Sequence, residues 1–137
     1  MRHKAAFRAA SLCLAYSALS ATPATAAPPP DWSHAERLDV KLSEYRFKPG
    51  RLEFEQGKVY DLHLENRGKE MHEFTAPEFF KTLDIKDASP LNGDRVEIEV
   101  APGAVKDLVF VAQKPGTYQL RCSDHDWAGM KGQITVK

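Results

Sequence analysis

Cysteine is scarce in this sequence, because only Cys13 and Cys122 occur among the 137 residues. Two cysteines are too few for the disulfide framework that stabilises many small secreted domains. The 19 basic residues equal the 19 acidic ones in number, so the chain has no net positive charge to attract nucleic acid. We therefore expect no nucleic-acid partner. A hydrophobic fraction of 42% and a charged fraction of 28% exclude a disordered or collagen-like chain and fit one globular domain.

The sequence also lacks an apolar run of the roughly 20 residues that a membrane-spanning helix needs. Residues 9–19 form an apolar run of about half that length, which follows a basic stretch and precedes the small residues 21–26. This order is typical of a secretory signal peptide. We therefore predict a signal peptide over residues 1–26, cleavage after Ala26 or Ala27, a periplasmic location, and no membrane insertion after cleavage.

Cleavage would leave Cys122 as the only cysteine. Removing 26 of the 137 residues leaves 111, in which 19 acidic residues face 16 basic ones. A single thiol in an oxidising compartment has no partner within its own chain. It must be buried, pair with another chain, or be held by a ligand.

The rest of the chain divides into a proline-rich extended leader, residues 27–37, and one domain, residues 38–137. Apolar and polar residues alternate with period two through most of this domain, and turn residues recur every eight to twelve positions. The pattern predicts an all-β Greek-key β-sandwich of seven to eight strands. The alternation changes phase at residues 43–44, which predicts a bulge or a strand that switches sheets. It is lost near residues 77–87, where we expect a short helical insertion.

Three potential metal ligands lie close together between the last two predicted strands. Cys122 is followed by His125 three residues later and by Met130 after five more. A thiolate, an imidazole and a thioether together suit copper in both oxidation states. His72, between a predicted turn and a strand, can supply a further strong ligand.

Each of these residues has an ordinary structural explanation when it is taken alone. A single inward cysteine is usually a small core residue, a loop histidine is usually solvated, and a methionine usually packs in the core. Their joint occurrence at this spacing, in an exported chain without a second cysteine, favours the metal site. His63 falls on the opposite face of its predicted strand and receives no ligand role.

The segment KPGTYQLRCSDHDWAGMKGQITV resembles the C-terminal part of the cupredoxins, the small blue copper proteins. Its Cys-x2-His-x4-Met spacing is similar to that of plastocyanins and pseudoazurins. The segment YRFKPGRLEFEQGKVYDLHLENRGKEMHEF resembles the N-terminal sheet of the family and the strand that carries the first histidine. The resemblance implies one type 1 copper ion that alternates between Cu(I) and Cu(II). His72, Cys122 and His125 would be its equatorial ligands, and Met130 its weak axial ligand.

Two positions depart from the family pattern. Many cupredoxins have asparagine directly after the first histidine, where this chain has Glu73, and many have proline before the second histidine, where it has Asp124. A carboxylate near the metal would move the site away from ordinary blue copper. Because adjacent strand residues face opposite ways, we expect Glu73 to point to solvent or to a partner on the ligand loop.

These features predict a monomeric one-electron carrier that is not an enzyme, because no nucleophile–base pair, paired carboxylates or phosphate-binding glycine loop is visible. Its partner would be a redox protein such as a c-type cytochrome or an oxidoreductase, which would dock around His125 against Trp127 and Met71. The alternative is a periplasmic copper-binding protein for copper tolerance or delivery. A two-copper electron-entry domain would need a second loop cysteine, whereas position 126 is Asp. A sandwich without metal is the remaining alternative.

Overall fold

The structure is a computed structural model that describes residues 28–137. The predicted signal peptide and its cleavage site, after Ala26 or Ala27, lie outside the described residues. Within the described part, no helix is both long enough and apolar enough to cross a bilayer.

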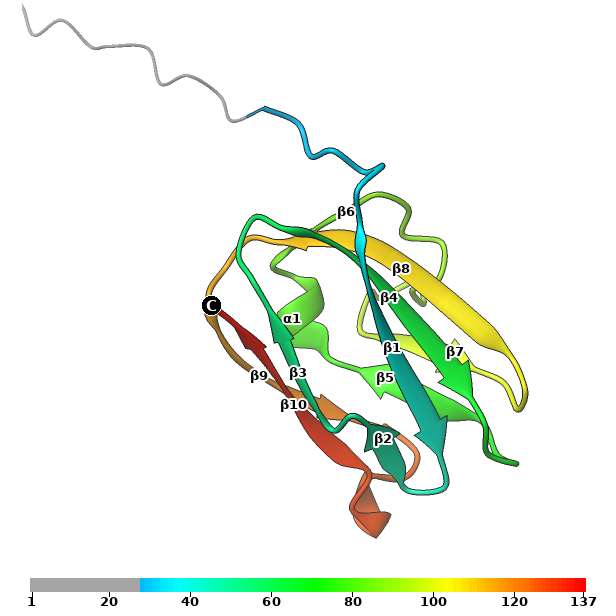
Figure 1. Cartoon of the computed structure of the whole chain (residues 1–137). Coiled ribbons are helices and arrows are strands. Elements are labelled where there is room, and N and C mark those ends of the chain that lie inside the picture. The colour runs from blue at the N-terminus through cyan, green and yellow to red at the C-terminus, as the bar shows by residue number, and fades with distance from the viewer. Residues whose placement is uncertain (1–27) are drawn as a thin grey trace, which may run out of the picture.

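Ten strands form two five-stranded sheets that face each other (Figure 1). The first sheet has the order β2-β1-β4-β8-β6 and contains β1 (Glu36–Ser43), β2 (Arg46–Lys48), β4 (Val59–Asn66), β6 (Leu83–Ile85) and β8 (Val105–Ala112). The second sheet has the order β3-β10-β9-β5-β7 and contains β3 (Arg51–Phe54), β5 (His72–Thr75), β7 (Glu97–Val100), β9 (Gly116–Arg121) and β10 (Lys131–Val136). The predicted all-β sandwich is confirmed. The strand count exceeds the prediction because β2 and β6 have only three residues each.

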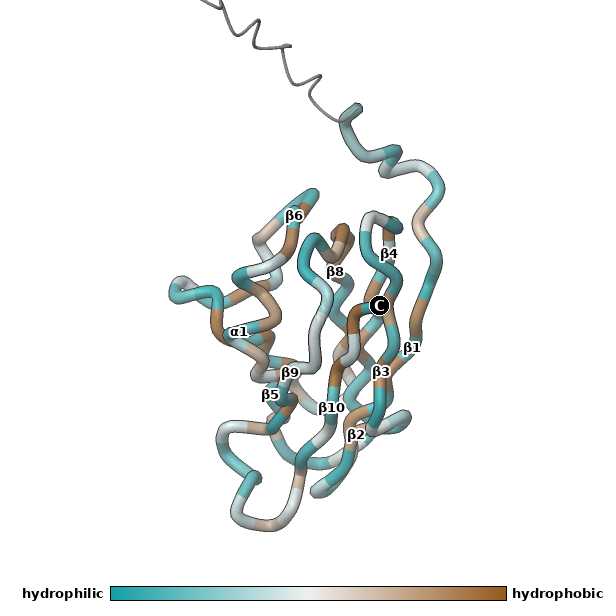
Figure 2. Tube along the Cα trace, turned by 90° about the vertical axis from the view of Figure 1, so that its left-hand side faces the viewer, coloured by the Kyte–Doolittle hydropathy of each residue, from teal (hydrophilic) through white to brown (hydrophobic). Residues whose placement is uncertain are grey.

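Period-two alternation buries one face of each sheet, and apolar and polar segments alternate along the strands in Figure 2. In β4, the side chains of Tyr60, Leu62 and Leu64 are buried. His63 points the other way and its Nδ1 lies 2.5 Å from a carboxylate oxygen of Asp107 on β8. This pairing confirms that His63 faces away from the interior.

The prediction of a bulge or a change of sheet at residues 43–44 is wrong. Strand β1 ends at Ser43, and β2 returns antiparallel to it in the same sheet, with Ser43 opposite Arg46. The connection is a tight turn in which Tyr45 has a φ of 66°. Reversal of direction at this turn, and not a bulge or a change of sheet, causes the shift in alternation.

The predicted helical insertion is shorter than expected. Helix α1 covers only Pro77–Phe80, and β6 then pairs with β8. The helix turns Phe79 and Phe80 into the interior, where the Phe79 ring lies 5.5 Å from that of Phe54. Burying such a side chain contributes about 1.5–3 kcal/mol, which explains why this segment packs inward despite its lack of strand alternation.

The connection between β9 and β10 lies at one end of the sandwich (Figure 1). It contains a one-turn 3-10 helix, Asp126–Ala128, and is called the ligand loop below, residues 122–130. The described part of the leader, residues 28–35, leaves from the opposite end (Figure 1). The leader therefore does not cover the end of the domain that carries the predicted metal ligands.

Candidate metal centre

A buried asparagine fixes the turn that leads into His72. The Asn66 side-chain amide donates to the carbonyl oxygens of Glu70 and Val100, at 2.8 and 2.7 Å. Its own side-chain oxygen accepts a hydrogen bond of 2.8 Å from the Gly68 amide. The bonds to Gly68 and Glu70 close the turn, and the bond to Val100 ties it to the neighbouring strand β7. Strand β5 therefore begins at a defined point, and its first residue, His72, is fully buried.

Backbone hydrogen bonds close the ligand loop. The Cys122 amide donates to the Met130 carbonyl oxygen at 3.0 Å, and the amides of His125 and Met130 donate to the carbonyl oxygens of Cys122 and His125, both at 3.3 Å. Gly129 adopts a φ of 86°, a left-handed conformation that costs glycine little. The loop thereby folds back on itself and brings Cys122, His125 and Met130 to one end of the sheet.

The structure brings together the three strong ligands that the sequence predicts. One ligating atom from each of His72, Cys122 and His125 lies within 4.8 Å of the other two. The Cys122 Sγ is 3.3 Å from His125 Nδ1 and 4.0 Å from His72 Nδ1. Metal–sulfur and metal–nitrogen bonds of about 2.3 and 2.0 Å at near-trigonal angles separate such atoms by roughly 3.3–4.0 Å. The arrangement therefore fits one metal ion.

Met130, the last residue of the ligand loop directly before β10, is fully buried. The hydrogen bond between its carbonyl oxygen and the Cys122 amide places it directly beside Cys122 in the fold. A thiolate and two imidazoles with a nearby thioether form a type 1 copper-like set. Asp126, which occupies the position where a two-copper site would need a cysteine, pairs instead with Arg121 at 3.2 Å.

Glu73 is the main departure from the sequence prediction. It does face away from His72, but it is only 4% exposed and does not reach solvent. Its Oε2 lies 2.9 Å from the Cys122 Sγ and accepts a second hydrogen bond of 3.3 Å from the Asp124 amide. Of the two expected surroundings, solvent or a partner on the ligand loop, the structure shows the loop partner. Because that partner includes the Cys122 thiol, the carboxylate also lies next to a predicted metal ligand. The end of β9 runs beside β5, so the loop covers this outward position.

Burial controls the protonation of the two innermost groups. Burial, followed by the hydrogen bond to Glu73, raises the pKa of the Cys122 thiol to about 11. Burial and the neighbouring His125 lower the pKa of His72, against a smaller opposing effect of Glu44. The apo site therefore holds a neutral thiol beside a neutral imidazole at pH 7.

The Nε2 atoms of His72 and His125 have different surroundings. His125 Nε2 lies 2.8 Å from a carboxylate oxygen of Glu70. His72 Nε2 is buried without a hydrogen-bond partner among the described residues, close to Gly68 and Glu44. The sequence did not single out Glu44 or Glu70, because each is a polar residue in or beside a turn and only the fold brings it to the histidines.

Two large hydrophobic residues are exposed beside His125, and Met71, directly before His72 in the chain, is exposed as well. Trp127 is 76% exposed, and Tyr45 and Met71 are 41% and 42% exposed. The Tyr45 ring lies 5.5 Å from the His125 ring and 6.0 Å from the Trp127 ring. Trp127 and Met71 were predicted at this surface, whereas Tyr45 was missed because it comes from the distant β1–β2 turn.

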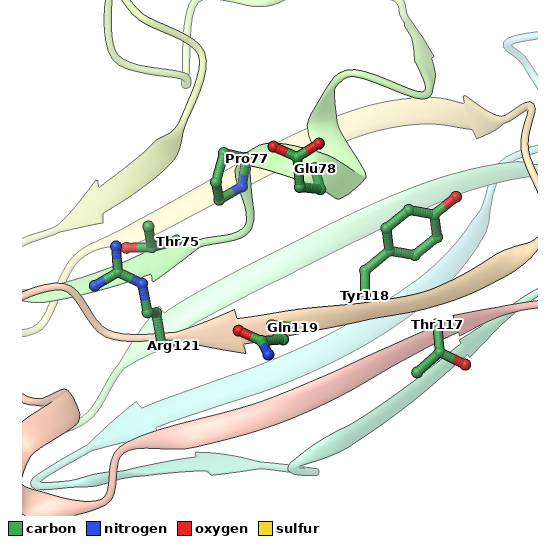
Figure 3. A pocket seen from close by; sticks show the side chains of 7 residues that line it. All are labelled: Thr75, Pro77, Glu78, Thr117, Tyr118, Gln119 and Arg121. Carbon is green, nitrogen blue, oxygen red and sulfur yellow. The ribbon is translucent and has the colours of Figure 1, made fainter.

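A separate pocket opens on the outside of the second sheet (Figure 3). Strands β5 and β9 pair only at Thr75 and Arg121, and a cavity of about 240 Å³ lies next to this pair. It is lined by Thr75, Pro77, Glu78, Thr117, Tyr118, Gln119 and Arg121. None of the predicted metal ligands lines it, so it is distinct from the metal centre.

Solved structures share this fold at low sequence identity. Auracyanin from the photosynthetic bacterium Roseiflexus castenholzii is 21% identical with a TM-score of 0.57, over 75% of this chain and 98% of that chain. Auracyanin B is 20% identical with a TM-score of 0.56, over 82% and 93%. A multicopper oxidase from Campylobacter jejuni, a metallo-oxidase, is 18% identical with a TM-score of 0.58, over 81% of this chain and 31% of that one.

No curated protein matches the sequence. The family of cupredoxin-like domains, in contrast, matches residues 10–136, which is nearly the whole chain. The family match agrees with the two-sheet sandwich, with the cluster of His72, Cys122 and His125, and with Met130 beside Cys122, which together are the ligand set for one copper ion. The chain therefore belongs to the family of cupredoxin-like domains.

Proposed function

We propose that the protein is a periplasmic one-electron carrier in which His72, Cys122, His125 and Met130 hold one copper ion. The observation that carries this proposal is the placement of ligating atoms from His72, Cys122 and His125 within 4.8 Å of one another. When bound, copper would supply a centre that gains and loses one electron. We further propose that the protein is not an enzyme, since four protein ligands leave no open position for a substrate.

The fold would keep this centre rigid. His72 lies on a strand whose start is fixed by Asn66, and the other three residues lie on a loop closed by its own backbone hydrogen bonds. His72, Cys122 and Met130 are all fully buried. Ligands that are held in place before the metal enters reorganise little when an electron is gained or lost, which suits a carrier.

His125 is the ligand closest to the surface, with a side chain that is 13% exposed. The apolar patch of Tyr45 and Trp127 lies beside it and offers contact area to a redox protein such as a c-type cytochrome, and the exposed Met71, next to His72 in the chain, adds apolar surface. Asp124 adds negative charge nearby, whereas the charge of Asp126 is partly balanced by Arg121. We propose that such a partner docks over this patch with a basic face that the acidic groups attract.

Two rates measured on the reduced, copper-loaded protein test this proposal. A carrier must transfer electrons to an oxidised c-type cytochrome faster than it loses Cu(I) to a competing chelator. Trp127→Ala should slow electron transfer while the visible copper–thiolate band stays intact. His63→Gln, on the outer face of the other sheet, is the matched control and should change neither rate.

Copper handling is the competing function, because it would use the same four residues. It predicts ready loss of Cu(I) to the chelator and electron transfer too slow to matter. Copper loss that outruns electron transfer would overturn the carrier assignment and would leave the fold and the metal ligands unaffected.

A further inference from the structure

The outer face of the second sheet carries a short row of polar residues beside the ligand loop. In the register of β5 with β7, Thr75 lies opposite Glu97, and Glu73 lies opposite Glu99. The intervening residues of both strands, such as Phe74 and Ile98, point inward and are buried. Three carboxylates, Glu73, Glu97 and Glu99, therefore lie on the outward face, and two of them, Glu73 and Glu97, contact the ligand loop.

Glu97 joins three separate parts of the chain. Its Oε2 accepts hydrogen bonds from the Thr75 hydroxyl on β5 and from the Ser123 hydroxyl in the ligand loop, both at 2.9 Å. Its other oxygen accepts a bond of 3.2 Å from the side-chain amide of Asn92. Hydrogen bonds to a charged group contribute about 1.5–3 kcal/mol each, roughly twice the value of neutral ones.

The turn before β7, residues 92–96, orients the Glu97 carboxylate. The Asn92 amide donates to the Glu97 carbonyl oxygen at 3.0 Å, and the Asn92 side-chain oxygen accepts a bond of 3.1 Å from the Val96 amide. Asn92 thus closes the turn that ends at Glu97. The segment before β7, for which the sequence suggested no role, serves to hold the Glu97 side chain at the ligand loop.

We propose that Glu97 is a positioning residue for the metal ligands. Ser123 directly follows Cys122, so its bond to Glu97 restrains the loop between Cys122 and His125. Glu73 restrains the same stretch through the Asp124 amide at 3.3 Å. Two carboxylates on neighbouring strands thus fix two consecutive loop residues to β5 and β7, and the 3.3 Å spacing of the Cys122 and His125 ligand atoms depends on that attachment.

The first test uses the protein without copper, so that it does not depend on the proposed function. The amides of Asp124 and His125 have acceptors in Glu73 and the Cys122 carbonyl, and their hydrogen exchange can be followed by NMR. Glu97→Ala should speed exchange at both amides roughly tenfold, the factor that corresponds to about 1.4 kcal/mol. Glu97→Gln should retain most of the protection, because its amide oxygen can still accept from both hydroxyls.

Glu99→Ala is the matched control, since Glu99 lies two residues away on the same face of β7 and forms no side-chain hydrogen bond among the described residues. It should leave exchange at both amides unchanged. Ser123→Ala removes the other end of the contact and should speed exchange at both amides in the same way as Glu97→Ala. It therefore tests the contact even if Glu97→Ala folds poorly. Wild-type exchange rates in Ser123→Ala, or equal effects of Glu97→Ala and Glu99→Ala, would overturn the positioning role.

The second test concerns the copper-loaded protein and rests on the proposed function. Looser attachment of the loop should shift the visible copper–thiolate band and speed Cu(I) loss to a chelator in Glu97→Ala, with recovery in Glu97→Gln. Faster amide exchange without any change in the copper-loaded protein would overturn the claim that Glu97 positions the ligands. If the wild type transfers no electrons to a cytochrome, the carrier proposal fails while the exchange results still decide the role of Glu97.

Discussion

The Sγ of Cys122 and a carboxylate oxygen of Glu73 lie 2.9 Å apart, and both residues are buried. In the apo protein the thiol donates a hydrogen bond to this oxygen, and the backbone amide of Glu73 lies 3.4 Å from the same sulfur. A metal-bound thiolate has no proton to donate. The carboxylate and the thiolate would then be two negative groups in contact, so Glu73 should directly influence the reduction potential of the copper site.

Glu73→Gln is therefore expected to raise the reduction potential of the copper-loaded protein. Removing a negative charge beside the thiolate disfavours the more positively charged Cu(II) form. We expect a rise of tens of millivolts, given that about 59 mV corresponds to a tenfold change for one electron. Voltammetry of both variants measures this, and an unchanged potential would show that Glu73 carries no charge next to the copper.

Cys122→Ser should abolish the intense visible band of the Cu(II) protein, because only a sulfur–copper bond supplies that transition. Met130→Leu is the companion variant, and it should keep the band while shifting the reduction potential, since the thioether is the weak ligand. Absorption spectra at equal copper loading compare the two. A band that survives in Cys122→Ser would mean that the ligands are misassigned.

Gly68→Ala should disturb the metal centre next to the Nε2 atom of His72. A Cβ at this position would lie 2.9 Å from His72 Nε2 and 2.7 Å from a carboxylate oxygen of Glu44. The Glu44 side chain can move, but the buried His72 ring cannot do so freely, and such overpacking costs about 1–3 kcal/mol. The unfolding temperature of Gly68→Ala should therefore fall, and the visible band of its copper-loaded form should shift.

Gly93→Ala is the control for this substitution. Nothing lies within 4 Å of the Cβ it would add. It should match the wild type in both measurements. Equal behaviour of the two alanine variants would show that the His72 ring is free to move.

The reactivity of the apo thiol should depend steeply on pH. With a pKa raised to about 11, Cys122 is protonated at pH 7, and only the thiolate attacks an alkylating reagent. The rate of alkylation should therefore rise about tenfold per pH unit between pH 7 and pH 9.5 without a plateau. A plateau near pH 8.5, the ordinary range for a thiol, would contradict the buried environment described for Cys122.

Local spacing made much of the metal centre predictable. Cys122, His125 and Met130 occupy one short loop, so their types and separations can be read directly, and backbone bonds within that loop bring them together. Alternation likewise predicted the sandwich, because a buried face imposes period two on every strand. The β1–β2 hairpin was missed since a tight turn shifts the alternation in the same way as a bulge.

The sequence by itself therefore determined the sandwich, the ligand types and the ligand loop, because each depends on residues close together in the chain. Only the tertiary structure decided what surrounds the ligands. Glu73 and Glu97 reach the loop because β5 and β7 pair beside it, and Tyr45 reaches His125 from a turn about 80 residues away. Pairing between strands that are far apart in the sequence sets these contacts. No local pattern of residues indicates which strands will be neighbours.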